Sequence, residues 1–174
     1  MVVGLGGRMA ALVTRRALIG GGLAAGAALA LAGGLRLPAA SEGGRVLSLA
    51  ERDVVAAVSS VMFPGVVMPR GTDVGVVDEV DRILAEVIPA VHAMGFRYLL
   101  RGLEWGPLYS HGDRFSRLDI AQRTEVLQIW ADPAVMPRRV ASDALKMVMG
   151  MAYFRNPAVH EAMGYHMSCG GGVA

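Results

Sequence analysis

Cysteine and lysine are scarce, because the chain of 174 residues contains only one of each. A single cysteine excludes an intrachain disulfide framework and any zinc or iron–sulfur site built from several cysteines. The motif C-x-x-C-H is absent as well, so the sequence has no attachment site for a c-type haem. Apolar residues make up 53% of the chain, too large a fraction for an intrinsically disordered protein. The composition therefore predicts a folded domain without a multi-cysteine metal centre.

The chain also lacks a basic domain, because its net positive charge is confined to the N-terminal segment. The whole chain has a net charge of +2 and a pI near 9.0, values that suggest an anionic partner. Residues 1–40 contain four arginines and no acidic residue (+4), whereas residues 41–174 contain 13 basic and 15 acidic residues (−2). A nucleic-acid binder needs a basic face to neutralise phosphates. The acidic balance of residues 41–174 therefore predicts no nucleic-acid partner.

The arginines near the N-terminus belong to a recognisable export pattern. The sequence Thr14-Arg15-Arg16-Ala17-Leu18 precedes an apolar run over residues 17–32, which ends in A-x-A triplets of the kind that signal peptidase accepts. This arrangement resembles a twin-arginine (Tat) signal, although Leu18 stands where phenylalanine is often found. The resemblance implies recognition by the Tat translocase, which carries folded proteins, and a location in the periplasm or at the outer face of the cytoplasmic membrane.

Two other interpretations of this segment are weaker. A retained membrane anchor needs about 20 apolar residues, and residues 17–35 supply 19, of which six are glycine. A dinucleotide-binding fingerprint would read G-x-G-x-x-A over residues 20–25, but that motif must follow a strand, and paired arginines precede it here. We therefore expect a signal peptide and linker over residues 1–40, with a retained anchor as the alternative.

The hydrophobic periodicity after residue 40 predicts a compact, all-α bundle of about five helices. We expect a helical domain over residues 41–166 and a flexible tail over residues 167–174. The first helix should open with a capping box, because Ser48 is followed three residues later by Glu51. The expected helices cover residues 49–62, 73–88, 94–109 and 137–154, and a fourth helix is expected between the cap at residues 116–119 and Asp132-Pro133. Gly106-Pro107 is expected to break the third helix, and a short helical turn follows Asn156-Pro157.

Side-chain positions follow from the same periodicity. The apolar stripe of the second helix should run from Val76 to Val91, with Asp81 on the outward, solvated face. We expect Ser116 to cap the fourth helix and Ile120 to point inward. The last helix has methionines at alternate positions, namely Met147, Met149 and Met151, and residues so spaced cannot share one helix face. Most of the chain's methionines are therefore expected in the core or in adaptable contacts.

No catalytic or metal-binding motif is evident. The serines lie outside any G-x-S-x-G elbow, and no two histidines have the i,i+3 or i,i+4 spacing that favours a metal site on a helix. A loose group of soft ligands near the C-terminus could suit copper, although the glycines around it would not hold the ligands in place. It consists of His160, His166, Met167 and Cys169. We therefore expect no catalytic residue, no metal and no cofactor in this chain.

Cys169 is the one residue with an expected covalent role. In an oxidising compartment an unpaired cysteine forms an intermolecular disulfide or remains a free thiol. Its position in the tail would let a partner subunit reach it. Both an inter-subunit disulfide and a free thiol without a role stay open.

The order of four segments resembles one known family. The segments are LSLAER at residues 47–52, Phe63-Pro64, GVVDEVD at residues 75–81 and NPAVHEAMGY at residues 156–165. Together with the export signal they resemble the gluconate 2-dehydrogenase subunit 3 family over roughly residues 12–166. Two departures occur, since Glu79-Val80 replaces an aromatic–isoleucine pair and His160 stands where tryptophan is common. These departures affect the identity of the partner more than the fold.

The resemblance implies an accessory rather than a catalytic role. The large subunit of such complexes is a glucose–methanol–choline (GMC) type oxidoreductase that holds FAD, oxidises an alcohol or sugar and usually lacks its own signal. The small subunit escorts this folded flavoprotein through the Tat translocase, and a cytochrome c subunit or another acceptor takes the electrons. The rival interpretation is a stand-alone exported helical protein that binds a small ligand or a metal.

Aromatic side chains are candidates for the docking surface, because interface cores are enriched in them. We expect the interface to include residues from the third helix onward. For Trp130 and Phe154, packing inside the domain is at least as consistent with the sequence as a place at the interface. The candidates are Trp105, Tyr109, Trp130, Tyr153, Phe154 and Tyr165.

Overall fold

The computed structural model describes residues 37–165, and this part of the chain is all-α, as predicted, with no strand. Five of its helices have eleven residues or more and match the five expected helices. Two shorter helices and one 3-10 turn complete the order along the chain. The long helices are α2 (Leu49–Met62), α3 (Val76–Glu86), α4 (Ala90–Trp105), α6 (Ile120–Trp130) and α7 (Met136–Phe154); the short ones are α5 (Leu108–His111), the 3-10 turn η1 (Phe115–Arg117) and α8 (Pro157–Ala162).

Helix α2 begins with the predicted capping box. The Ser48 hydroxyl accepts the Glu51 backbone N–H, and the Glu51 carboxylate accepts the Ser48 backbone N–H at 2.8 Å. These two bonds satisfy N–H groups that the first turn of a helix otherwise leaves unpaired. The helix ends at Met62, just before Phe63-Pro64, because the residue before a proline disfavours helical backbone angles.

The boundary between α3 and α4 differs from the expected one. Helix α3 ends at Glu86 and Pro89 caps α4, so the predicted stripe from Val76 to Val91 is divided between two helices. Val76, Val80, Ile83 and Leu84 are buried as predicted, whereas Val91 is exposed. The proline at position 89 removes a backbone donor and starts a new helix with a new facing direction.

Helix α6 is capped by Asp119 rather than by Ser116. The Asp119 carboxylate accepts the Gln122 backbone N–H at 2.8 Å, and the Gln122 side chain accepts the Asp119 N–H. Ser116 lies in η1, where its hydroxyl donates to the buried carboxylate of Glu104. The prediction that Ile120 points inward is also wrong, because Ile120 occupies the exposed first position of the helix.

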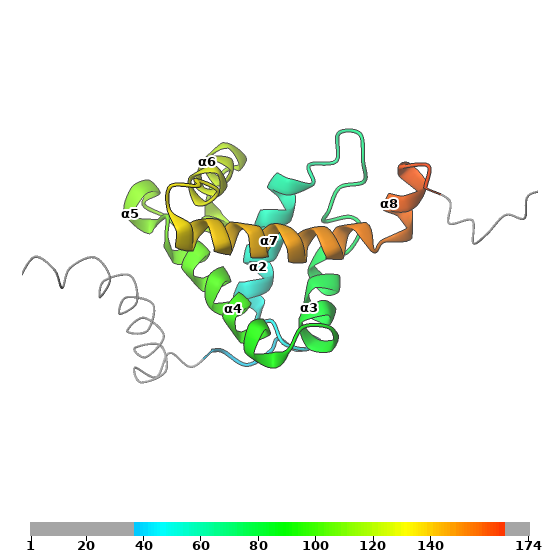
Figure 1. Cartoon of the computed structure of the whole chain (residues 1–174), viewed down its shortest axis with the longest axis horizontal. Helices are drawn as coiled ribbons and strands as arrows, with labels where there is room; N and C mark the ends of the chain where they lie inside the picture. Colours follow the sequence, from blue (N-terminus) through cyan, green and yellow to red (C-terminus); the bar gives the residue numbers. More distant parts are fainter. Residues whose placement is uncertain (1–36, 166–174) are drawn as a thin grey trace, which may run out of the picture. The chain divides into compact units, whose positions relative to one another are not determined.

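Helices α2 and α7 organise the packing. Helix α2 contacts α3, α4, α6 and η1, and α7 contacts α3, α4, α6 and α8. In Figure 1, α7 crosses in front of α2, and α3 and α4 descend on either side of it. The core between these helices is aliphatic, with Phe115 as its largest fully buried side chain; it includes Leu47, Val54, Val58, Val80, Ile83, Leu100, Leu103 and Met149.

Tyr153 secures the loop between α2 and α3 to α7. Its ring stacks on Phe63 with centroids 3.9 Å apart and an interplanar angle of 2°. Its hydroxyl donates to the Pro69 carbonyl at 2.7 Å, and burial raises the pKa of this phenol. The base of the loop is therefore fixed, while Val66 and Val67 at its tip are exposed.

Candidate functional site

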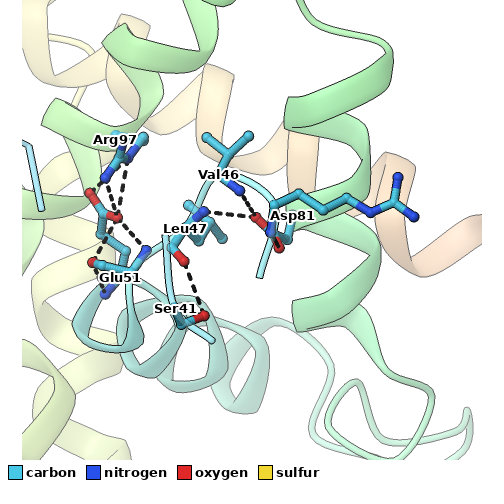
Figure 2. A network of polar contacts seen from close by, with 8 residues as sticks. Ser41, Val46, Leu47, Glu51, Asp81 and Arg97 are labelled. Atoms are coloured by element: carbon cyan, nitrogen blue, oxygen red, sulfur yellow. Dashed lines mark hydrogen bonds and ion pairs between the residues drawn. The ribbon is translucent and has the colours of Figure 1, made fainter. Parts of the chain in front are cut away.

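Asp81 holds the segment before α2 against α3. Its carboxylate accepts three consecutive backbone N–H groups, from Arg45 at 2.6 Å, Val46 at 2.9 Å and Leu47 at 2.7 Å. Figure 2 shows this carboxylate turned toward the backbone of that segment. The expectation of a solvated Asp81 is wrong, since only 3% of the residue is exposed. The periodicity placed it off the apolar stripe, but it is the polar edge of a buried face.

The charge of Asp81 is stabilised in this position. Burial opposes ionisation, but the three backbone donors and the nearby Arg52 guanidinium outweigh it, and the pKa of Asp81 lies below its ordinary value. The Arg52 Nη1 lies 3.5 Å from the carboxylate. The carboxylate is therefore an ionised structural anchor, and its lone pairs are directed to the backbone rather than to a substrate.

A second buried carboxylate joins α2 to α4. Glu51, which closes the capping box, also accepts from Arg97 Nε at 3.1 Å and from Arg97 Nη2 at 3.0 Å. Figure 2 shows the guanidinium and the carboxylate face to face. A fork-to-fork arginine–carboxylate pair fixes both distance and angle between the two helices. Like Asp81, Glu51 is fully engaged in maintaining the fold.

Helix α7 has an apolar surface on two sides. Its inner side places Leu145, Val148, Met149 and Ala152 in the core. Its outer side carries a second stripe with helical spacing, whose members are 37–62% exposed. We call this set the α7 stripe: Met136, Val140, Met147, Met151 and Phe154. A helix that is apolar on opposite sides is normally covered on both, so the α7 stripe is a candidate contact surface.

A groove adjoins the α7 stripe. It has a volume of about 590 Å³ and lies between the first half of α4 and the middle of α7. Three small residues, Gly95, Ala141 and Ala144, contribute to its lining, and a Cβ atom added at Gly95 would meet no atom within 4 Å. His92 is the one lining residue with an ionisable side chain. We call this feature the α4–α7 groove; its chemistry suits an apolar side chain and offers little to a polar ligand.

The aromatic residues expected at an interface divide into two groups. Trp105, Tyr109, Phe154 and Tyr165 are exposed, and the Arg114 guanidinium lies 4.2 Å from the centre of the Trp105 ring. Tyr153 is only 3% exposed, so its expected place on a docking surface is wrong. Trp130 packs partly against the core. The exposed aromatics do not form one cluster, since Trp105 and Tyr109 lie at α4–α5 and Tyr165 follows α8.

Several expected site residues lie outside residues 37–165. They are the signal residues Thr14, Arg15, Arg16 and Leu18, and the tail residues His166, Met167 and Cys169. Within the described range, no group of three or more histidine, cysteine or acidic residues is placed to hold a metal ion. No helix in that range has the length and apolar character needed to cross a bilayer. His160 contacts the Phe154 carbonyl and the Tyr165 ring.

The methionines of α7 illustrate what the sequence pattern missed. Met149 is buried while Met147 and Met151 are exposed, in agreement with the prediction that the three cannot share one face. The spacing of positions 136, 140, 147, 151 and 154 was available in the sequence. This second stripe does not stand out in the sequence, because the inner stripe alone already gives α7 the pattern of an ordinary amphipathic helix.

Comparison with known proteins assigns the family. The family described as Gluconate 2-dehydrogenase subunit 3 matches residues 50–171. Searches of curated proteins and of solved structures each found no match. The matched segment covers well over half of the chain and runs from the second residue of α2 to beyond α8. The chain therefore belongs to the gluconate 2-dehydrogenase subunit 3 family, whose members are named as subunits of a dehydrogenase complex.

Proposed function

We propose that this chain is the non-catalytic small subunit of an exported dehydrogenase complex. Its partner is a GMC-type large subunit that contains FAD and oxidises a CH–OH group of a sugar or alcohol. The small subunit binds the folded flavoprotein, stabilises it and brings it to the Tat translocase. A cytochrome c subunit is a further partner in passing the electrons on. Family membership over residues 50–171 is the observation that carries the proposal.

The helical body is consistent with this binding role. Its three buried carboxylates, Asp81, Glu51 and Glu104, are consumed by contacts with backbone N–H groups, with Arg97 and with Ser116. Its apolar α7 stripe is instead presented outward. Contiguous exposed apolar surface on a folded protein marks sites of interaction with another protein or a membrane. A subunit that works by association needs such a surface more than it needs an acid, a base or a metal.

The export part of the proposal depends on Arg15 and Arg16. The pair precedes an apolar run and an A-x-A site, the arrangement of a Tat signal. The complex would then function in the periplasm or at the outer face of the cytoplasmic membrane. A signal-less flavoprotein would leave the cytoplasm only when it is bound to this chain.

Co-expression with a candidate flavoprotein tests the proposal. The natural candidate is a FAD oxidoreductase without a signal, encoded in a neighbouring reading frame. With the wild-type chain, both proteins should appear in the periplasmic fraction. With Arg15→Lys and Arg16→Lys combined, both should remain in the cytoplasm. If the flavoprotein is still exported beside the double variant, the escort role is wrong.

A second candidate function is a stand-alone exported protein that binds a small apolar ligand. The α4–α7 groove favours it, because about 590 Å³ is within the range of ligand pockets. Such pockets normally add a few convergent polar groups that orient the ligand, and here His92 alone is ionisable. Mass spectrometry of the chain purified from its own periplasm would distinguish the two functions, by recovering either a flavoprotein or a small molecule.

A further inference from the structure

The exposed surface of α7 is large enough for a protein partner. Together, the five side chains of the α7 stripe expose on the order of 500 Å² of apolar surface, which is within the range of the largest patch of a typical monomer, a patch that is often functional. The adjoining lining of the α4–α7 groove extends this surface toward the roughly 800 Å² per partner of a stable interface. A small molecule would cover the groove and leave the stripe in water. The area therefore favours a macromolecular occupant.

The shape of the surface favours a helix in that role. The stripe is a ridge of about five turns, and the groove runs beside it, with Gly95, Ala141 and Ala144 allowing a close approach. An amphipathic helix laid along such a groove places apolar side chains at i, i+3, i+4 and i+7 into it. Methionines such as Met147 and Met151 adapt to the shape of the partner side chains.

The charges beside the stripe define the chemistry of that helix. One flank of the stripe carries Arg139 and Lys146, and Asp143, the one acid of α7, lies 3.9 Å from Arg139. Arg138 lies on another side of the helix, where it lines a hollow with Pro107 and Trp130. This excess of positive charge stands out on a body whose net charge is −2 over residues 41–174. Complementary potentials across an interface steer association and exclude wrong partners. The partner helix should therefore carry carboxylates beside its apolar face.

The same charges disfavour two other occupants. A second copy of this chain, packed through α7 on a twofold axis, would bring the Arg139–Lys146 flank against itself. A lipid bilayer would meet the basic flank favourably, but a flat surface cannot fill the α4–α7 groove. The stripe also lacks the tryptophan that surface-bound helices commonly place in the membrane interface.

We propose that the α7 stripe and the α4–α7 groove are the docking site for one amphipathic, acid-flanked helix of the FAD-containing large subunit. This inference rests on the proposed function and assigns its interface to a particular surface. In this arrangement the partner's apolar side chains enter the groove over Gly95, and its carboxylates face Lys146 and Arg139.

Affinity measurements with the purified flavoprotein test the assignment. Val140→Asp and Met147→Asp each place a carboxylate in the apolar surface, and each should weaken binding by about thirtyfold or more, the level of an interface hot spot. Lys146→Glu should weaken binding by about tenfold and reduce its salt dependence. Leu49→Asp is the matched control, because Leu49 is 70% exposed at the start of α2, far along the chain from α7; its affinity should stay within threefold of wild type.

A groove-filling variant separates docking from folding. Gly95→Leu adds a side chain into the groove and replaces a glycine inside a helix, which raises helix propensity. We expect an unchanged or higher melting temperature together with about tenfold weaker binding. If the Val140, Met147 and Gly95 variants all bind the flavoprotein as wild type does, the assignment of this surface is wrong while the escort role stands.

Two further outcomes overturn the inference. If wild type itself does not bind the flavoprotein, both the proposed function and this interface fail. If wild type binds but the α7 variants lose only attachment to phosphatidylglycerol vesicles, or only self-association in light scattering, the surface faces a membrane or a second copy instead.

Discussion

Replacing the Asp81 carboxylate by an amide should destabilise the whole helical body. In Asp81→Asn, one oxygen can still accept from Val46 and Leu47, but an NH₂ group takes the place of the oxygen that accepts from Arg45 at 2.6 Å. A buried donor then faces a donor, and the negative charge opposite Arg52 is lost. Removing one partner of a buried, charge-assisted contact costs about 3 kcal/mol. For a urea slope of about 2 kcal/mol/M, the midpoint falls by about 1.5 M.

The matched control is Asp78→Asn, on the same helix and with the same change of atoms. Asp78 also pairs with an arginine, Arg52, but its side chain is 77% exposed. Exposed ion pairs contribute about 0–1 kcal/mol, so the control should unfold close to the wild-type midpoint. Urea denaturation followed by far-ultraviolet circular dichroism measures both. Equal midpoints for the two variants would refute the claim that Asp81 is a structural anchor.

The pH dependence provides an independent reading of the same contact. The pKa of Asp81 is depressed in the folded state, so its stabilisation is complete above the ordinary aspartate pKa of about 3.9. It is lost as the pH falls through the folded-state value below that. Between pH 5 and pH 2 wild type should therefore lose more unfolding free energy than Asp81→Asn. Parallel curves for the two proteins would contradict the assignment of a depressed pKa to a stabilising contact.

Three further predictions concern the rest of the fold. Glu51→Gln should lower the unfolding free energy by about 3 kcal/mol, because it weakens the pair with Arg97 and half of the capping box; urea denaturation checks it, and a loss below 1 kcal/mol would contradict it. Tyr153→Phe removes the bond to the loop carbonyl but keeps the ring stack, so we expect a loss of about 1 kcal/mol and faster proteolysis of the loop in a timed trypsin digest. Gly150→Ala should stabilise α7 by about 0.5–1 kcal/mol, whereas Gly75→Ala should destabilise the protein by about 1–2 kcal/mol, because φ at Gly75 is +68°. At neither position would the added Cβ meet an atom within 4 Å, so the difference should come from backbone conformation alone. If thermal melts shift in the same direction for both variants, backbone conformation is not the cause.

Helix existence was predictable where local chemistry specifies it. The Ser48–Glu51 capping box, the stop at Pro64 and the break at Gly106-Pro107 all depend on residues close in sequence, and the structure has each of them. The errors in boundaries occurred at Pro89 and Asp119. In both places two neighbouring residues could begin a helix, and the choice depends on the direction in which the chain must pack.

The polar contacts were not predictable for a different reason. Asp81 appears in the sequence among Asp78, Glu79 and Arg82, as one of several charges on a helix surface. Its burial depends on backbone N–H groups that lie 34–36 residues earlier in the chain. Backbone donors leave no signature in side-chain periodicity. The position becomes visible only when residues 45–47 are placed against α3.

The candidate docking surface was only partly predictable from the sequence. The members of the α7 stripe have helical spacing, but a helix with two apolar sides cannot be oriented by periodicity alone. Packing against α3 and α6 decides which side is inward, and the remaining side then becomes a surface that requires an explanation. The aromatic residues were a less direct guide, since Tyr153 is buried and the exposed aromatics are dispersed.

The composition of the complex tests the central claim most directly. The chain should be purified from the periplasm after co-expression with the neighbouring flavoprotein, and flavin absorbance compared with the amount of each polypeptide. The account predicts one FAD and one large subunit for each copy of this chain, and a flavin-free periplasm when Arg15 and Arg16 are both replaced by lysine. A monodisperse, flavin-free small subunit from the wild-type strain, with the flavoprotein left in the cytoplasm, would contradict it.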